Sequence, residues 1–282
     1  MIPEAELRRR AAGQKVDPMI LNLDYCLGWF LGALYGEKVF QERLRFKGGT
    51  CLRKAYFPEY RFSEDLDFTA TAAVNEERLR EVIERTFQWA EEKGGPDFSA
   101  DAPRFEVVSD EHGAETLQIR LYLRGPLRFA GSPQAIRLDV TQDEPLLLPA
   151  EKRPLIHPYS DAEVLGRVIL PCYPLVEVLA EKIRAVGGQR RFAISRDIYD
   201  IYRLVHSGVG ATSVLPLLER KFAAKGIGLA SVSVKTMLAR RSQFERDWKA
   251  NLSYLIPRGQ EVPFGEAWET TLSVLSQVEP AQ

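Results

Sequence analysis

Hydrophobic positions recur with two different periods along the chain. Helical spacing, with apolar residues every three or four positions, covers residues 17–45 and 75–95 and then most of the chain after residue 173. A period of two, typical of half-buried strands, occurs in three segments: 65–70, 116–123 and 135–141. The pattern therefore predicts a first half that combines helices with strands and a second half made of helices alone.

These patterns indicate an α+β fold class with two domains. We expect a mixed sheet with flanking helices in a domain that spans residues 1–173. The proline-rich stretch 145–174 is predicted to be irregular. An all-helical domain, 174–282, is expected to follow and to complete the cleft of an active site.

A double glycine follows a short segment, 44–47, that is predicted to be extended. In the sequence Lys47-Gly48-Gly49-Thr50, the threonine stands where an N-cap is expected for a helix over 51–57. Glycines before a helix allow backbone N–H groups to approach a phosphate closely. An ordinary turn is the alternative. The Walker pattern GxxxxGK[ST] is absent, which argues against an ATPase or kinase of that type.

Two aspartates lie one residue apart in an apolar strand-like run. Asp65 and Asp67 should project from one face of the strand while Leu66 and Phe68 enter the core. Asp139 lies on the polar face of a separate predicted strand. If the two strands are neighbours, three carboxylates converge on a site suited to Mg²⁺. The alternative is that all three are solvated strand residues, although aspartate is depleted from strands.

The helical half contains a lysine at the edge of an apolar stripe and two aspartates on one helix face. Lys182 either extends its ammonium group to water or points into a cleft to hold a triphosphate. In the second case Lys182→Ala should cost little stability, because burying a lysine is unfavourable. Asp197 and Asp200 lie three residues apart, so either could hold Lys182 or Arg196 in position.

Composition narrows the class of protein. The 282 residues are 45% hydrophobic and 27% charged, and the formal net charge of -1 gives no overall attraction to nucleic acid or membrane. Cys26, Cys51 and Cys172 form no CxxC pair, so neither a disulfide framework nor a zinc site is indicated. No segment approaches about 18 uninterrupted apolar residues. We expect a cytoplasmic protein without membrane association.

Positive charge is concentrated in one stretch of the helical half. Residues 216–250 contain eight basic residues against three acidic ones, a local charge of +5. The eight are Arg220, Lys221, Lys225, Lys235, Arg240, Arg241, Arg246 and Lys249. Such a basic helical face is consistent with contacts to an RNA backbone, and the alternative is an ordinary solvated face.

Taken together, five motifs resemble the AbiEii/AbiGii toxin family of nucleotidyltransferases, which includes the mycobacterial MenT toxins. In order along residues 24–205 they are FKGGTCLRKAY, RFSEDLDF, RLDVT, LVEVLAEKIRA and RDIYDIYRL. The resemblance implies a DNA-polymerase-β-like core followed by a helical domain. It implies that Gly48 and Gly49, within the Lys47–Thr50 segment, hold nucleotide phosphates and that Asp65 and Asp67 bind Mg²⁺ or Mn²⁺. Lys182 and Asp197 match essential positions.

The same resemblance implies a function. The chain is expected to transfer a nucleoside monophosphate from an NTP to the 3′ end of tRNA, as the toxin partner of a cognate antitoxin. Ser63, beside the carboxylates, matches a serine that a kinase antitoxin phosphorylates in relatives. One alternative is the same chemistry on a protein or small-molecule hydroxyl. Another is a non-catalytic RNA-binding scaffold, against which the retained Asp65, Asp67, Lys182 and Asp197 argue.

Overall fold

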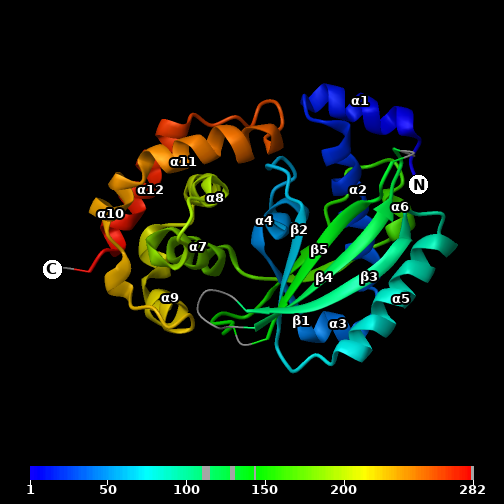
Figure 1. The fold of residues 1–282 in the computed structure, drawn as a ribbon, viewed down its shortest axis with the longest axis horizontal. Coiled ribbons are helices and arrows are strands. Elements are labelled where there is room, and N and C mark those ends of the chain that lie inside the picture. The colour runs from blue at the N-terminus through cyan, green and yellow to red at the C-terminus, as the bar shows by residue number, and fades with distance from the viewer. Residues whose placement is uncertain (110–114, 128–130, 143, 281–282) are drawn as a thin grey trace. The chain divides into compact units, whose positions relative to one another are not determined.

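The computed structural model describes residues 1–109, 115–127, 131–142 and 144–280. The chain forms two compact units, coloured blue to green and yellow to red for most of their length in Figure 1. Unit 1 comprises Met1–Leu146, Ala150–Cys172 and Leu255–Gln260, and unit 2 comprises Leu147–Pro149, Tyr173–Tyr254 and Glu261–Gln282. The main boundary lies beside residue 173. Leu147–Pro149, before this boundary, nevertheless belongs to unit 2, and Leu255–Gln260, after it, belongs to unit 1.

Unit 1 is built on a seven-stranded mixed sheet in the order β3-β4-β5-β2-β1-β7-β6 (Figure 1). Its strands are β1 (Leu44–Lys47), β2 (Asp65–Ala70), β3 (Asp97–Ser109), β4 (Glu115–Arg124), β5 (Gln134–Thr141), β6 (Glu151–Pro154) and β7 (Ile169–Cys172). β2 is the central strand, parallel to β5 and antiparallel to β1. The three strands with a period of two are confirmed as β2, β4 and β5.

The helices of unit 1 are α1 (Glu4–Gln14), α2 (Pro18–Leu34), α3 (Lys38–Arg43), α4 (Gly48–Cys51), α5 (Glu76–Glu92) and α6 (Ala162–Leu165). A capping side chain marks the start of two of them, α2 and α5. The Asp17 side chain accepts from the Met19 N–H at 2.7 Å before α2, with Pro18 at the first helical position. Asn75 accepts from the Glu77 N–H at 2.8 Å before α5. α2 is buried almost throughout, so it forms the centre of the unit's core.

The sheet has one apolar and one polar face over β2, β4 and β5. Leu66, Phe68, Ile119 and Leu138 are fully or almost fully buried in the same core cluster as α2. Most of the intervening residues, which alternate with these along each strand, are polar or charged. This second face holds the carboxylates that the sequence singles out.

Unit 2 is helical, as expected. It contains α7 (Leu175–Arg184), α8 (Ser195–His206), α9 (Ala211–Ala223), α10 (Val234–Ala239), α11 (Arg241–Asp247) and α12 (Phe264–Val278). α7 packs against α8 and α9, and α12 packs against α8 and α9 in turn. No helix in the described part of the chain is long and apolar enough to cross a membrane.

Five of the helices and strands given above have no counterpart in the sequence prediction: α1, α6, β3, β6 and β7. β3 is an edge strand whose sequence includes Pro103, and most of its side chains are exposed, so its alternation is weak. β6 and β7 are four residues each and lie in the stretch expected to be irregular, 145–174. Their strand structure depends on pairing with each other and with β1.

Candidate active site

The polar face of the sheet brings the predicted carboxylates side by side. β5 is the neighbour of β2, and Asp67 is the register partner of Asp139. Lys47 on β1 faces Asp67 from the other side of the strand. Gln118 on β4 donates from Nε2 to Oδ1 of Asp139 at 3.0 Å. The predicted common face of Asp65 and Asp67, opposite the buried Leu66 and Phe68, is confirmed.

A guanidinium group lies among these carboxylates. Arg137, the register partner of Asp65, donates from Nη2 to Oδ2 of Asp65 at 2.8 Å. Its Nε lies 3.4 Å from Oδ2 of Asp139. Within the described residues, no group of three or more His, Cys, Asp or Glu side chains is arranged to hold a metal ion. In this conformation the cation between Asp65 and Asp139 is supplied by the protein.

The double glycine is required by close packing against the carboxylate strand. Gly48 has φ of +77°, and a Cβ built there would overlap the Asp67 carboxylate. A Cβ on Gly49 would lie 2.5 Å from Nη2 of Arg61 and 3.1 Å from Oγ of Ser63. The turn therefore lies directly against Asp67 on one side and Ser63 on the other.

The expected helix start at Thr50 is wrong. α4 begins at Gly48, with Lys47 as the residue before it, so Thr50 is inside the first turn. The Thr50 hydroxyl donates to the backbone carbonyl of Asp65 and so joins α4 to β2. The Lys47 ammonium is buried and forms an ion pair with Glu144. In this structure both polar members of the KGGT segment make contacts inside unit 1.

A buried charge cluster that sequence reasoning missed fixes the segment after α4. Asp24 of α2 accepts from Nε of Arg53 at 2.6 Å and from Nζ of Lys54 at 2.8 Å. Burial alone would raise the pKa of Asp24, but the two cations outweigh burial and hold that pKa well below its usual range. Arg53 also donates to the Tyr60 carbonyl at 2.5 Å and stacks over Phe62 at 3.6 Å. The sequence signal was a carboxylate inside the apolar run of α2.

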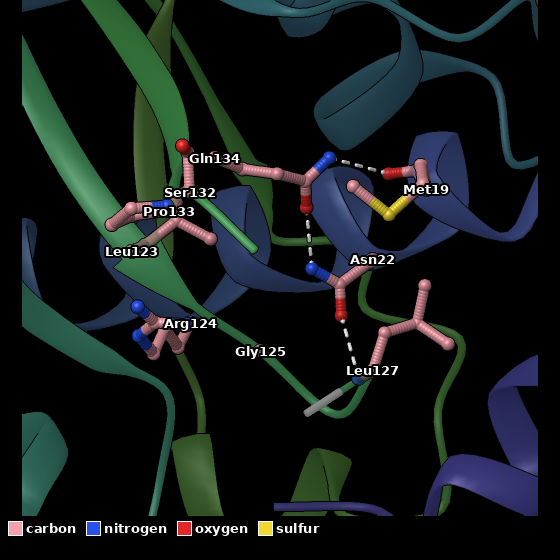
Figure 2. A pocket seen from close by; sticks show the side chains of 9 residues that line it. All are labelled: Met19, Asn22, Leu123, Arg124, Gly125, Leu127, Ser132, Pro133 and Gln134. Atoms are coloured by element: carbon pink, nitrogen blue, oxygen red, sulfur yellow. Dashed lines mark hydrogen bonds between the residues drawn. The ribbon is translucent and has the colours of Figure 1, made fainter. Parts of the chain in front are cut away.

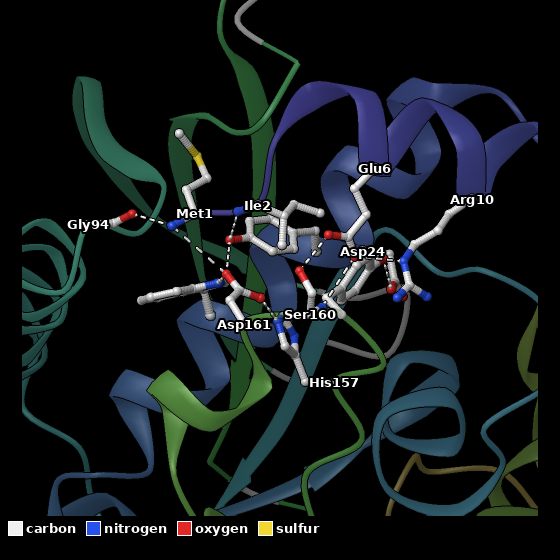
Figure 3. A network of polar contacts seen from close by, with 12 residues as sticks. Met1, Ile2, Glu6, Arg10, Asp24, Gly94, His157, Ser160 and Asp161 are labelled. Carbon is white, nitrogen blue, oxygen red and sulfur yellow. Dashed lines mark hydrogen bonds and ion pairs between the residues drawn. The ribbon is translucent and has the colours of Figure 1, made fainter.

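A second network joins the N-terminal helices to the segment before α6 (Figure 3). Tyr25 donates to Oδ2 of Asp161 at 2.5 Å, and Nε2 of His157 lies 3.3 Å from Oδ1 of the same carboxylate. Nδ1 of His157 packs against Gly28 and has no hydrogen-bond partner among the residues that the structure describes. Burial lowers the pKa of His157 below its ordinary value, although the contact with Asp161 acts in the opposite direction.

A small pocket lies at the start of β5 (Figure 2). Its volume of about 20 Å³ has room for a single water molecule. The side chains of Asn22 and Gln134 bond to each other at 2.5 Å, while Gln134 donates to the Met19 carbonyl and Asn22 accepts from the Leu127 N–H, each at 3.0 Å (Figure 2). These amides are engaged within the protein, so the pocket does not bear on the chemistry.

In unit 2, Lys182 is held by both predicted aspartates. Its Nζ lies 2.7 Å from Oδ1 of Asp197 and 2.8 Å from Oδ2 of Asp200. Burial alone would raise the pKa of Asp197, but Arg190 and then Lys182 outweigh burial and lower it. The expectation that Asp197 or Asp200 holds Lys182 is confirmed. The alternative of an ammonium extended to water is wrong, because two buried carboxylates accept it.

The basic helical face is smaller than its sequence suggested. Lys221 is completely buried, with Nζ 2.7 Å from Glu177 and 2.9 Å from Glu181. Lys225 is also buried. Lys221 pairs with carboxylates of α7, about 40 residues upstream in the chain. The local sequence around Lys221 therefore could not predict that this lysine is buried. The exposed basic residues that remain are Arg220, Lys235, Arg241, Arg246 and Lys249.

Comparison with known proteins decides the family. The model of the family described as "Nucleotidyl transferase AbiEii toxin, Type IV TA system" matches residues 29–274. The chain belongs to the AbiEii family. It is a nucleotidyltransferase toxin of a toxin–antitoxin system, and the resemblance noted in its motifs is confirmed. No curated protein matches this AbiEii chain.

Solved structures share the AbiEii fold. MenT4, a nucleotidyltransferase toxin from Mycobacterium tuberculosis H37Rv, matches with a TM-score of 0.69 at 23% identity, covering 100% of this chain and 91% of that chain. JHP933 from Helicobacter pylori matches with a TM-score of 0.59 at 14% identity, covering 94% of this chain and 93% of that chain. A putative nucleotidyltransferase from H. pylori matches with a TM-score of 0.54 at 13% identity, covering 92% of this chain and 94% of that chain. At these identities the likeness concerns the fold, and the expected fold class is confirmed.

Proposed function

We propose that this AbiEii enzyme transfers a nucleoside monophosphate from an NTP to the 3′ end of tRNA in the cytoplasm and so blocks aminoacylation. The observation that carries the proposal is the contact of the Gly48 turn with Asp67, beside Asp139 and Asp65 on the polar face of the sheet. A phosphate-binding turn and a set of carboxylates are thereby adjacent, as nucleotidyl transfer requires.

The chemistry of these side chains suits a divalent metal ion, which would have to displace Arg137 from Asp65 and Asp139 or share their oxygens with it. Mg²⁺ and Mn²⁺ prefer carboxylate oxygens together with substrate phosphates, and Asp65, Asp67 and Asp139 offer such oxygens from two neighbouring strands. The glycine at position 48 leaves room for the Asp67 carboxylate that a Cβ would fill. A metal ion held by these three residues would act as a Lewis acid on the α-phosphate and neutralise charge on the leaving pyrophosphate.

The remaining groups of the chain would bind and orient the substrate. Gly48 and Gly49 allow the backbone to approach phosphate oxygens, and Lys47, Thr50 and Ser63 flank that turn. Lys182, held between Asp197 and Asp200, supplies a positioned cation for the triphosphate. In the reaction the acceptor oxygen forms a bond to the α-phosphorus and releases its proton to water, while the bond from that phosphorus to the pyrophosphate oxygen breaks and pyrophosphate leaves.

The RNA acceptor is supported by the exposed basic residues of unit 2. Arg220, Lys235, Arg241, Arg246 and Lys249 lie in or beside its helices α9 to α11. Each contact with a phosphate releases counterions, so binding should weaken with salt. Exchanging these five residues for Gln should weaken RNA binding and flatten its salt dependence, while NTP binding is retained.

Regulation by a kinase antitoxin would act at Ser63. Its hydroxyl lies beside Gly49, and a phosphate there would add about 1.5 to 2 negative charges close to the carboxylates. Ser63 is buried, so a kinase needs the segment before β2 to open. Ser63→Glu should abolish transfer, whereas Ser63→Ala should retain most of it and resist phosphorylation.

The deciding experiment is incubation of the purified protein with each labelled NTP, total RNA and Mg²⁺, followed by gel electrophoresis. Label in tRNA that disappears with EDTA supports the proposal. Label in protein or in a small molecule moves the acceptor to a protein or small-molecule hydroxyl. Absence of label with all four NTPs and either metal contradicts the proposal.

A further inference from the structure

An aromatic side chain stands in solvent on the loop between α7 and α8. Phe192 is 75% exposed, the highest value among the exposed large hydrophobic side chains of the described residues. It follows Arg190 and Arg191 directly. In the same unit, by contrast, Phe222 and Phe244 are buried in the helical core.

The loop that carries Phe192 is held in place from several sides. Arg240 donates from Nη1 to the Arg190 carbonyl at 3.3 Å and from Nη2 to the Arg191 carbonyl at 3.0 Å. Nη1 of Arg190 lies 2.9 Å from Oδ2 of Asp197, at the start of α8. Earlier in the same connection, Gly188 packs so closely on Ser231 that a Cβ would overlap its side chain. The backbone that leads into Phe192 is therefore held by several contacts.

A fixed loop with an exposed phenyl ring gives up the free energy that burial of the ring would contribute. Nucleic-acid-binding proteins stack bases on exposed aromatic side chains close to arginines, and Phe192 directly follows two. The phenyl ring offers a stacking face to any base, and the exposed Arg191 offers charge to its phosphate. Arg241, which follows the loop-contacting Arg240 in the chain, is also exposed and adds positive charge.

We propose that Phe192 is a stacking platform for a nucleobase, with Arg191 beside it to contact the attached phosphate. The inference rests on the proposed function, because it takes the ligand to be a nucleotide. The base belongs either to the incoming NTP or to the RNA acceptor, and the chemistry of recognition is shared. Asp197 forms ion pairs with both Arg190 and Lys182, so the loop that carries Phe192 is connected to Lys182 through this carboxylate.

Three variants test the platform. Phe192→Ala removes the ring, Phe192→Trp keeps a stacking face and adds a fluorescent reporter, and Leu215→Ala is the control. Leu215 is an exposed apolar residue of α9 in the same unit. Each protein is titrated with a non-hydrolysable NTP analogue and, separately, with a fluorescently labelled single-stranded RNA ending in CCA.

We expect Phe192→Ala to weaken binding of one of the two probes by about fivefold to a hundredfold, the range for one stacked base. Phe192→Trp should bind that probe as wild type does, with quenching of the new tryptophan, and Leu215→Ala should match wild type. Loss confined to the NTP analogue assigns the base to the nucleotide, and loss confined to RNA assigns it to the acceptor.

Equal binding of both probes by Phe192→Ala and wild type would overturn the platform, whatever the transfer assay gives. Failure of the proposed function is a different result: wild type then labels no tRNA. The NTP titration still decides the role of Phe192 in that case. Wild type that binds neither probe contradicts both.

Discussion

Arg137 bridges Asp65 and Asp139, with its Nη2 at 2.8 Å from the first carboxylate and its Nε at 3.4 Å from the second. A divalent metal ion bound by the same carboxylates has to displace this guanidinium or share oxygens with it. The bridge therefore keeps the like charges of the polar face compensated when no metal is bound.

Arg137→Gln should strengthen binding of Mn²⁺ in the absence of NTP by about tenfold, because a competing positive charge is removed. Mn²⁺ binding is measured by electron paramagnetic resonance of the free ion. The matched control is Arg120→Gln on β4, the register neighbour of Arg137, which changes net charge equally. Unchanged Mn²⁺ affinity in Arg137→Gln would show that the guanidinium does not compete with the metal.

Asp65→Asn and Asp67→Asn should each reduce nucleotidyl transfer by at least about a hundredfold, because an amide keeps the shape of the side chain but loses the charge that attracts a metal ion. Circular dichroism should show a folded protein. Asp101→Asn, an exposed residue of β3, serves as the control and should remain active. Full activity in either site variant, or undiminished wild-type activity in EDTA, argues against a metal held by this pair.

Gly48→Ala should abolish transfer and lower stability by more than the about 1–2 kcal/mol that a left-handed backbone costs a side chain. The excess comes from overlap of the new Cβ with the Asp67 carboxylate. Gly94→Ala measures the cost of the left-handed backbone alone, because Gly94 has φ of +65° and nothing lies within 4 Å of its Cβ position. Urea unfolding and transfer are measured on both variants, and equal stability losses would exclude the overlap.

Lys182→Met should lower the free energy of unfolding by about 3–5 kcal/mol at neutral pH, because two buried carboxylates lose the cation between them. This reverses the expectation from sequence that removing the lysine costs little. Lys249→Met, whose partner Glu245 is exposed, should leave stability nearly unchanged. Urea unfolding checks both variants, and a Lys182→Met protein as stable as wild type would contradict the structural role.

Stability should fall as the pH is lowered from about 7 toward 5.5, and His157 should account for the change. Burial lowers the pKa of His157 below its ordinary 6.5, so the unfolded chain binds a proton in this window that the folded protein does not. The free energy of unfolding begins to fall near the pKa that His157 has in the unfolded chain and continues to fall down to its lower pKa in the folded protein. The slope is at most about 1.4 kcal/mol per pH unit. The pKa values of Asp24, Asp161 and Asp197 are lowered, so these groups titrate below the window.

Urea unfolding of His157→Asn at several pH values checks this origin. The variant is less stable at pH 7 because it loses the contact with Asp161, but its stability should vary less with pH. His206→Asn, at an exposed position, should keep the wild-type slope. A slope that persists in His157→Asn would assign the pH dependence to another group.

Local pattern was sufficient for the strand that carries the carboxylates. The period of two placed Asp65 and Asp67 on one face because strand geometry depends only on neighbouring residues. The adjacency of Asp139 needed a parallel pairing between segments about 70 residues apart, which no local pattern contains. Thr50 illustrates the same limit, since the Asp67 carboxylate and the Asp65 carbonyl fix where α4 begins.

Charge counts along the chain were the weakest guide. Lys221 contributed to a predicted RNA surface, although Glu177 and Glu181 take it into the core. The contact of Arg137 with Asp65 could not be predicted from the sequence, because it crosses strands. Phe192 gave no signal, since exposure of one aromatic residue is a property of the folded loop.

The central position of β2 has a consequence for amide hydrogen exchange. Residues 67–69 pair with β1 on one side and β5 on the other, so their N–H groups become accessible only when the sheet itself opens. Such amides exchange by global unfolding and should be among the slowest in the protein. A partner that switches the enzyme off while it stays folded therefore leaves their protection unchanged, and its footprint should appear in the faster-exchanging segments around the carboxylates.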